Sequence, residues 1–265
     1  MPDVLDEARE TTQRVARTFA LACRLLPKPI RDDVYRLYLV FRTLDDLVDE
    51  EDPRAEVAVS AVEHWSRGGA AQSKEARVLE ELATRHPIPR DAMLDFCRGM
   101  RDDMEAVPIV DEEGLDTYCY RVAGTVGVVM TAILGADDVA TANRHAAALG
   151  KAMQRTNILR DIDEDAANGR VYLARRTVEQ YGGRLDPGCR AELVRDQIAR
   201  ADALYDVGMD GIRHLRCGRA AIRAAAAMYR EILRQIERDG YGARAGRAVV
   251  KRRRKLVVVA RTARS

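Results

Sequence analysis

Apolar and polar positions along the chain follow helical rather than strand periodicity. Helix-favouring residues such as Ala, Leu, Arg and Glu are abundant, and the alternation of β-branched and polar residues that marks strands is nearly absent. Prolines and glycine pairs divide the chain into segments. The pattern predicts helices at about residues 3–25, 30–50, 54–66, 73–85, 90–106, 112–134, 139–165, 189–210, 218–239 and 243–262, with a loop at 166–172.

The predicted helices belong to one structural unit. The sequence contains no long linker, no low-complexity tract and no repeat of fixed period. We therefore expect residues 1–265 to form a single all-α domain, in which about eight or more helices surround a central cavity.

The most apolar segment lies at residues 122–136. It is fifteen residues long, shorter than the roughly 20 that span a bilayer, so we interpret it as a buried helix. Gly124 and Gly127 each cost about 1 kcal/mol relative to Ala inside a helix. Such glycines mark either a close helix–helix contact or room for an apolar ligand at a bend, and the sequence leaves both open.

A polar stripe runs along the predicted helix at 30–50. Its members follow one another at spacings of four, three and four residues, so they share one helical face: Tyr38, Arg42, Asp45 and Asp49. Apolar residues occupy the other faces of this helix.

A second polar stripe lies on the predicted helix at 139–165. Its spacings are three, four and four: Gln154, Asn157, Asp161 and Asp165. Asp163 adds a further carboxylate, but the helical period points it away from the stripe. We therefore expect Asp163 to be exposed.

Acids four residues apart on a helix repel one another, and a bound cation reverses that effect. One such pair alone would usually be a solvated helix face. Two pairs, each in phase with further polar residues, favour a shared site. Mg²⁺ prefers oxygen ligands and often bridges carboxylates to phosphates, so facing stripes can hold about two or three Mg²⁺ ions and a diphosphate. An EF-hand is excluded because the spacing is helical and no loop glycine follows.

Composition adds the cellular context. Hydrophobic residues make up 47% and charged residues 32% of the chain, which suits a soluble protein with a sizeable core. The N-terminus is acidic and lacks the apolar core of a secretory signal. Five scattered cysteines, never in a CxxC pair, indicate a reducing compartment without zinc or disulfides. We expect a cytoplasmic protein, and the sequence gives no indication of its oligomeric state.

Charge is concentrated at the C-terminus. Residues 241–265 contain nine Arg and Lys and no acid, whereas the rest of the chain is net acidic. The plain interpretation of the basic run at 251–255 is the solvated face of a last helix. The alternative is peripheral contact with an anionic membrane surface. Nucleic-acid binding is not expected, because aromatic interleaving and a known binding motif are absent.

Five strings carry a resemblance to a known family. They are RTFALACRLLP, FRTLDDLVDE, YCYRVAGTVG, AMQRTNILRDIDEDAANGRVYL and YREILRQIERDGY. In this order, over about residues 13–260, the chain resembles the squalene/phytoene synthase family. The resemblance implies the isoprenoid-synthase helical bundle. It also implies Mg²⁺-dependent head-to-head condensation of two C15 or C20 prenyl diphosphates through a cyclopropylcarbinyl diphosphate.

The resemblance also implies roles for individual residues. Asp45 with Asp49, and Asp161 with Asp165, correspond to the two metal motifs. Catalytic positions correspond to Phe19, Tyr38, Arg42, Tyr118, Arg121 and Tyr172. Substrate-binding positions are Gln154, Asn157, Arg170 and Gly124. Guanidinium groups suit phosphate oxygens, and aromatic rings suit a carbocation.

Two other functions remain open at this point. A terpene cyclase on the same scaffold would ionise and cyclise a single prenyl diphosphate with the same aspartates. A non-catalytic assembly protein would have lost metal ligands, which are all present here. No Gly-rich dinucleotide fingerprint occurs, and the use of NADPH stays open.

Overall fold

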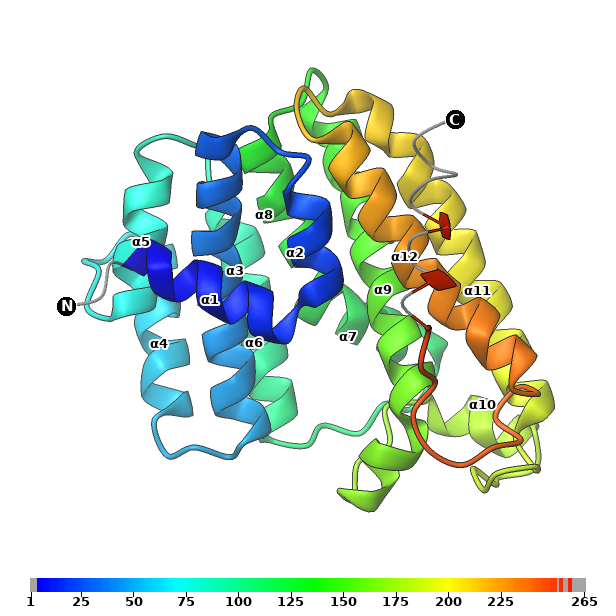
Figure 1. Ribbon diagram of the computed structural model, residues 1–265. Helices are drawn as coiled ribbons and strands as arrows, with labels where there is room; N and C mark the ends of the chain where they lie inside the picture. The colour runs from blue at the N-terminus through cyan, green and yellow to red at the C-terminus, as the bar shows by residue number, and fades with distance from the viewer. Residues whose placement is uncertain (1–3, 252, 255–256, 259–265) are drawn as a thin grey trace.

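The computed structural model describes residues 4–251, 253–254 and 257–258 (Figure 1). These residues form an all-α bundle, as predicted, and no strand occurs among them. The α-helices are α1 (Val4–Val15), α2 (Arg17–Cys23), α3 (Lys28–Asp49), α4 (Ala55–Ser66), α5 (Lys74–Ala83), α6 (Arg90–Met104), α7 (Glu112–Cys119), α8 (Thr125–Leu134), α9 (Val139–Ala167), α10 (Arg175–Gln180), α11 (Ala191–Asp210) and α12 (Arg219–Arg238).

Most predicted helices exist, and the differences have local causes. The helix expected at 3–25 breaks at Ala16, between α1 and α2. The helix expected at 112–134 contains a π-helical turn at Tyr120–Gly124, which joins α7 to α8. The short α10 was not predicted.

The prediction of a helix at 243–262 is wrong for residues 243–251, which follow an irregular path. Gly240, Gly242 and Gly246 adopt φ values of 85°, 82° and 88°, which a right-handed helix cannot contain. Only 253–254 and 257–258 are helical farther on, and the remainder of the predicted range lies outside the described residues.

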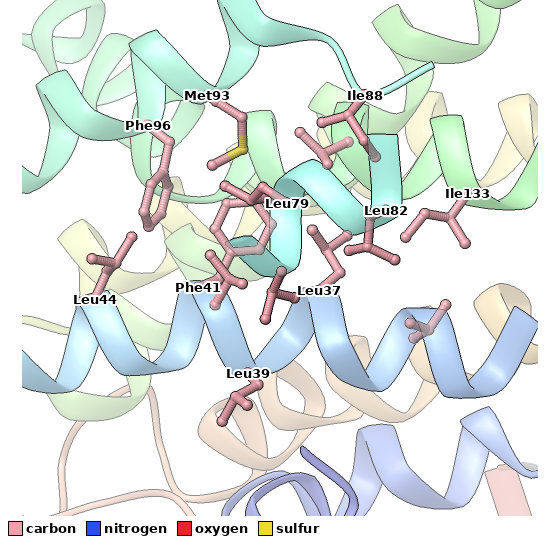
Figure 2. Packing of buried hydrophobic residues seen from close by; sticks show 14 of the residues in the cluster. Leu37, Leu39, Phe41, Leu44, Leu79, Leu82, Ile88, Met93, Phe96 and Ile133 are labelled. Atoms are coloured by element: carbon pink, nitrogen blue, oxygen red, sulfur yellow. The ribbon is translucent and has the colours of Figure 1, made fainter. Parts of the chain in front are cut away.

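Two apolar clusters hold the bundle together. The first joins α3 to α5, α6 and α8, and Figure 2 shows Leu37, Phe41 and Leu44 of α3 in this cluster with side chains of the neighbouring helices. Phe41 meets Phe96 edge to face, with ring centroids 4.7 Å apart. The second cluster joins α9 to α7, α11 and α12. The apolar faces of α3 and α9 thus pack into two separate clusters.

The segment at 122–136 is an interior helix of the bundle. The continuous helical stretch at 112–134 is long and apolar enough to cross a membrane, but half of its most apolar window is buried, and α8 packs against α3, α6 and α9. A Cβ on Gly127 would lie 2.4 Å from the Ala146 carbonyl oxygen, and one on Gly150 would lie 2.2 Å from that of Ala123. These glycines therefore permit close contact between α8 and α9.

Candidate active site

A polar cavity of about 640 Å³ lies between α3 and α9. It brings together ten of the residues expected from the sequence. From the two stripes come Arg42, Asp45, Asp49, Gln154, Asn157, Asp161 and Asp165, and from other elements come Tyr118, Arg170 and Tyr172. The two aspartate pairs therefore face one cavity, although α3 and α9 are far apart in sequence.

The carboxylates in this cavity are poorly compensated. Desolvation, and next the charge of Asp49, raises the pKa of Asp45 to about 7. Desolvation and then the charge of Asp161 raise the pKa of Asp165 to about 7. Desolvation also raises the pKa of Asp49. The protein alone thus disfavours the ionised forms, and added positive charge would stabilise them.

Arginines provide part of that charge. Arg42 forms ion pairs with Asp45 at 3.0 Å and with Asp46. Arg160 binds Asp161 through two nitrogens at 2.8 and 2.5 Å. Arg160 was not among the residues expected from the sequence, although it lies beside Asp161 in the chain and lines the cavity.

A third acidic helix contributes Asp103, which was also missed. This α6 residue accepts a hydrogen bond from the Tyr118 hydroxyl at 3.2 Å, and burial raises its pKa to about 6. Tyr118 stacks on Tyr172 with ring centroids 5.3 Å apart, and Arg170 donates to the Tyr172 hydroxyl at 3.1 Å. The only sequence signal for Asp103 was a pair of adjacent acids in the string MRDDME. This pair is not part of a polar stripe like those on α3 and α9.

The donor set fits Mg²⁺. Asn157 donates to Gln154 at 3.1 Å, while its own Oδ1 is buried without a hydrogen-bond partner among the described residues. In that part of the chain, no three His, Cys, Asp or Glu side chains converge on one point. Mg²⁺ is commonly held by one or two carboxylates, with waters and substrate phosphates completing its six ligands. The two aspartate pairs match that mode of binding.

An apolar cavity of about 220 Å³ adjoins the polar one. Phe19 of α2 lines it together with residues of α8, α9 and α12, and Val122 lines both cavities. Phe19 also contacts Tyr38, with ring centroids 5.5 Å apart. Burial raises the pKa of Tyr38 to about 12, so this phenol stays neutral.

Three selected residues lie outside the linings of both cavities. Tyr38 packs against Phe19, which lines the apolar cavity. Arg121 forms an ion pair with Asp102 at 2.5 Å. A Cβ on Gly124 would lie 2.9 Å from the Tyr120 ring and 3.3 Å from the Ala147 carbonyl oxygen, so Gly124 serves helix packing. The π-helical turn rotates this segment relative to a regular helix, which helical spacing alone could not indicate.

The expectation that Asp163 is exposed was wrong. Asp163 does point away from the stripe, but its side chain is only 25% exposed, because it forms an ion pair with Arg190, which is 3% exposed. The far side of α9 is covered by loops, which a helical period does not reveal.

Comparisons with known proteins agree with this arrangement. The sequence profile described as squalene/phytoene synthase matches residues 12–254. The chain belongs to the squalene/phytoene synthase family. A phytoene synthase of Thermus thermophilus is 37% identical over 91% of this chain and 87% of its own length. A 15-cis-phytoene synthase of Synechococcus elongatus is 32% identical over 97% of this chain and 91% of its own.

Solved structures of the family share the fold. The crystal structure of a dehydrosqualene synthase in complex with ligand superposes with a TM-score of 0.90 and 25% identity, over 98% of this chain and 95% of that one. The squalene synthase HpnC from Alicyclobacillus acidocaldarius gives 0.77 and 26%, over 90% and 95%. This member of the squalene/phytoene synthase family is therefore a prenyl transferase that joins prenyl diphosphates head to head.

Proposed function

We propose that the chain couples two C20 prenyl diphosphates, in a Mg²⁺-dependent reaction through a cyclopropylcarbinyl diphosphate, to a C40 phytoene-type hydrocarbon. The observation that carries the proposal is the junction of the two cavities at Val122. At this junction the polar cavity, which suits a diphosphate, adjoins the apolar cavity, which suits an isoprenoid tail. The names of the two relatives above support the C20 substrate.

The first step breaks the C–O bond of one allylic diphosphate, and the bonding electrons leave with the diphosphate. Bound to Asp45, Asp49, Asp161 and Asp165, about two or three Mg²⁺ ions would neutralise the leaving group. Arg42, Arg160 and Arg170 line the same chamber and can donate charge-assisted hydrogen bonds to the diphosphate oxygens. Their guanidinium groups remain charged at any working pH.

The resulting allylic cation needs an environment without water. The stacked rings of Tyr118 and Tyr172 line the polar cavity together with Val122, and an aromatic face there would stabilise a cation electrostatically. The lining of the apolar cavity is almost wholly hydrocarbon, as at Val126 and Ala146. Among the described lining residues, the one hydroxyl, on Thr131, donates to the Gly127 carbonyl oxygen at 3.1 Å. The double bond of the second substrate can then attack the cation, and loss of a proton closes the cyclopropane ring.

The second diphosphate leaves in the same chamber, and the rearranged cation loses a proton to give a phytoene-type product. A squalene-type product would instead require a hydride from NADPH. The proposal therefore includes no need for NADPH.

Membrane contact through the basic C-terminal segment stays a prediction. Lys251 and Arg253 are exposed, whereas Arg254 pairs with Glu231 at 2.8 Å. Residues 252 and 255 of the basic run, and 256 and 259–260 of its apolar continuation, lie outside the described residues.

One experiment tests these points together. The purified protein is incubated with C15 or C20 prenyl diphosphate and Mg²⁺, with and without NADPH, and products are analysed by mass. We expect a C40 hydrocarbon from the C20 substrate without NADPH, and two diphosphates released per product. A C20 cyclic product would contradict coupling and favour a cyclase. Undiminished turnover in EDTA would contradict the role of Mg²⁺.

A further inference from the structure

The polypeptide after α12 turns back past α9, as Figure 1 shows. We name residues 239–251 the C-terminal strap. Residues 243–251 of the strap have no regular secondary structure, and three glycines with positive φ lie between 240 and 246. The local sequence therefore does not fix the path of the strap, and its position must come from contacts with the bundle.

Arg190, immediately before α11, makes the central contact. Its side chain is 3% exposed. It binds both carboxylate oxygens of Asp163, at 2.5 and 2.8 Å, and donates to the carbonyl oxygens of Leu185 at 2.9 Å and Gly242 at 3.2 Å. One guanidinium thus joins α9, the loop before α11 and the strap. A Cβ at Gly242 would lie 2.5 Å from Arg190 Nε.

Asp163 makes a second contact with the strap. Its Oδ2 accepts a hydrogen bond from the Gly246 amide at 2.6 Å. Asp163 and Arg190 together form what we name the strap clamp, which holds the strap at Gly242 and again at Gly246.

The next residue is Arg247, which lines the polar cavity. Its Nε lies 3.0 Å from Asp161 Oδ1, and its Nη1 lies 3.6 Å from Glu164. The side chain is half exposed, so it can turn toward an anion in the cavity. Its backbone directly follows the amide that Asp163 holds.

We propose that the strap clamp is a positioning device for the diphosphate site. Asp163 and Arg190 do not line the polar cavity, and they act by holding Arg247 beside Asp161 at that cavity. This inference rests on the proposed function, because it assigns Arg247 to the diphosphate. It gives Asp163 a role distinct from those of Asp161 and Asp165 on the same helix.

The test is a double-mutant cycle on pyrophosphate binding, measured by calorimetry with saturating Mg²⁺ on the full chain. The variants are Asp163→Asn, Arg247→Met and the double variant. Loss of positioning contacts behind a site typically weakens it on the order of tenfold or more. We expect Asp163→Asn and Arg247→Met each to weaken binding about tenfold. The double variant should bind no more weakly than Arg247→Met, because Asp163 acts through Arg247.

Glu63→Gln is the matched control. Glu63 is 15% exposed and pairs with Arg67 and Arg101 between α4 and α6. The substitution therefore removes a comparable ion pair that lies away from the strap. Its pyrophosphate affinity should equal that of the wild type. Hydrogen exchange at strap amides 243–249 should rise in Asp163→Asn but not in Glu63→Gln or Arg247→Met.

The outcomes separate the two proposals. Wild-type affinity in Asp163→Asn, or effects that multiply in the double variant, would overturn the clamp while leaving the diphosphate site intact. If the wild type itself fails to bind pyrophosphate with Mg²⁺, the proposed function is overturned and the clamp with it. Should Asp163→Asn fail to fold, Arg190→Lys replaces it, because lysine keeps the charge but loses the bidentate geometry. The double-mutant cycle of Arg190→Lys with Arg247→Met then tests the clamp by the same criteria.

Discussion

Replacing Asp45 by Asn should stabilise the metal-free protein while removing its activity. The free protein holds Asp45 in a cavity where desolvation and Asp49 raise its pKa from 3.8 to about 7. An acid with a raised folded-state pKa binds more protons when folded than when unfolded. Its ionisation therefore opposes folding, and the penalty grows as the pH rises from about 4 to 7 and is complete above 7.

The structure sets the size of this effect. The rise in the pKa of Asp45 from 3.8 to about 7 would correspond to about 4 kcal/mol. The Asp45 side chain is 44% exposed, however, so water screens much of this penalty. Asn also weakens the 3.0 Å contact with Arg42. We expect a net gain of about 1 kcal/mol at pH 8, or about 2–4 °C in melting temperature.

The assay is thermal or urea unfolding of both proteins at pH 8 and pH 5, without Mg²⁺ and then with it. The gain should be full at pH 8, clearly smaller at pH 5 because the folded carboxyl is then mostly protonated, and diminished by Mg²⁺. Asp46→Asn is the control, because Asp46 also pairs with Arg42 but does not line the cavity. A gain in Asp45→Asn that is equal at both pH values, or no gain at pH 8, would refute the reasoning.

Four further predictions follow from the same contacts. Asp161→Ala should lower diphosphate release on the order of 10²-fold or more while circular dichroism stays unchanged, and near-normal release would contradict its assignment. Glu112→Ala should lower the free energy of unfolding by about 3 kcal/mol in urea. Arg155 is 5% exposed and pairs with Glu112 at 2.9 Å, so the substitution leaves a buried charge poorly compensated. Phe41→Ala should lose about 3–5 kcal/mol by the same assay, since Phe41 is 6% exposed; a loss below 1 kcal/mol would contradict its core role. Ala225→Leu places a larger side chain in the lining of the apolar cavity and so shortens the space for the tail. It should reduce turnover of the C20 substrate about tenfold more than that of C15, as product mass analysis can measure.

Helical periodicity predicted which side chains share a helix face, but not what packs against that face. Spacing alone placed the members of each aspartate pair on one face, because neighbours three or four residues apart are fixed by the helix itself. The same spacing placed Asp163 correctly off the stripe. It could not tell that Arg190, from a different part of the chain, covers that side of α9.

The motif strings also predicted site residues outside the two helical stripes. They associated Tyr118, Arg170 and Tyr172 with the aspartates, and the structure brings all three to the polar cavity. They also selected Arg121, which instead pairs with Asp102. A π-helical turn changes the phase of that segment by one residue, and local sequence gives little warning of it.

The sequence by itself determined most of the helices, their polar and apolar faces, and the presence of two aspartate stripes, because each depends on neighbours within a turn or two. The tertiary structure decided which faces meet. It brought Asp103 from α6 and Arg247 from the strap to the same cavity, and it joined that cavity to an apolar one at Val122. Those relations depend on how distant segments pack, and the irregular strap has no periodicity from which its place could be predicted.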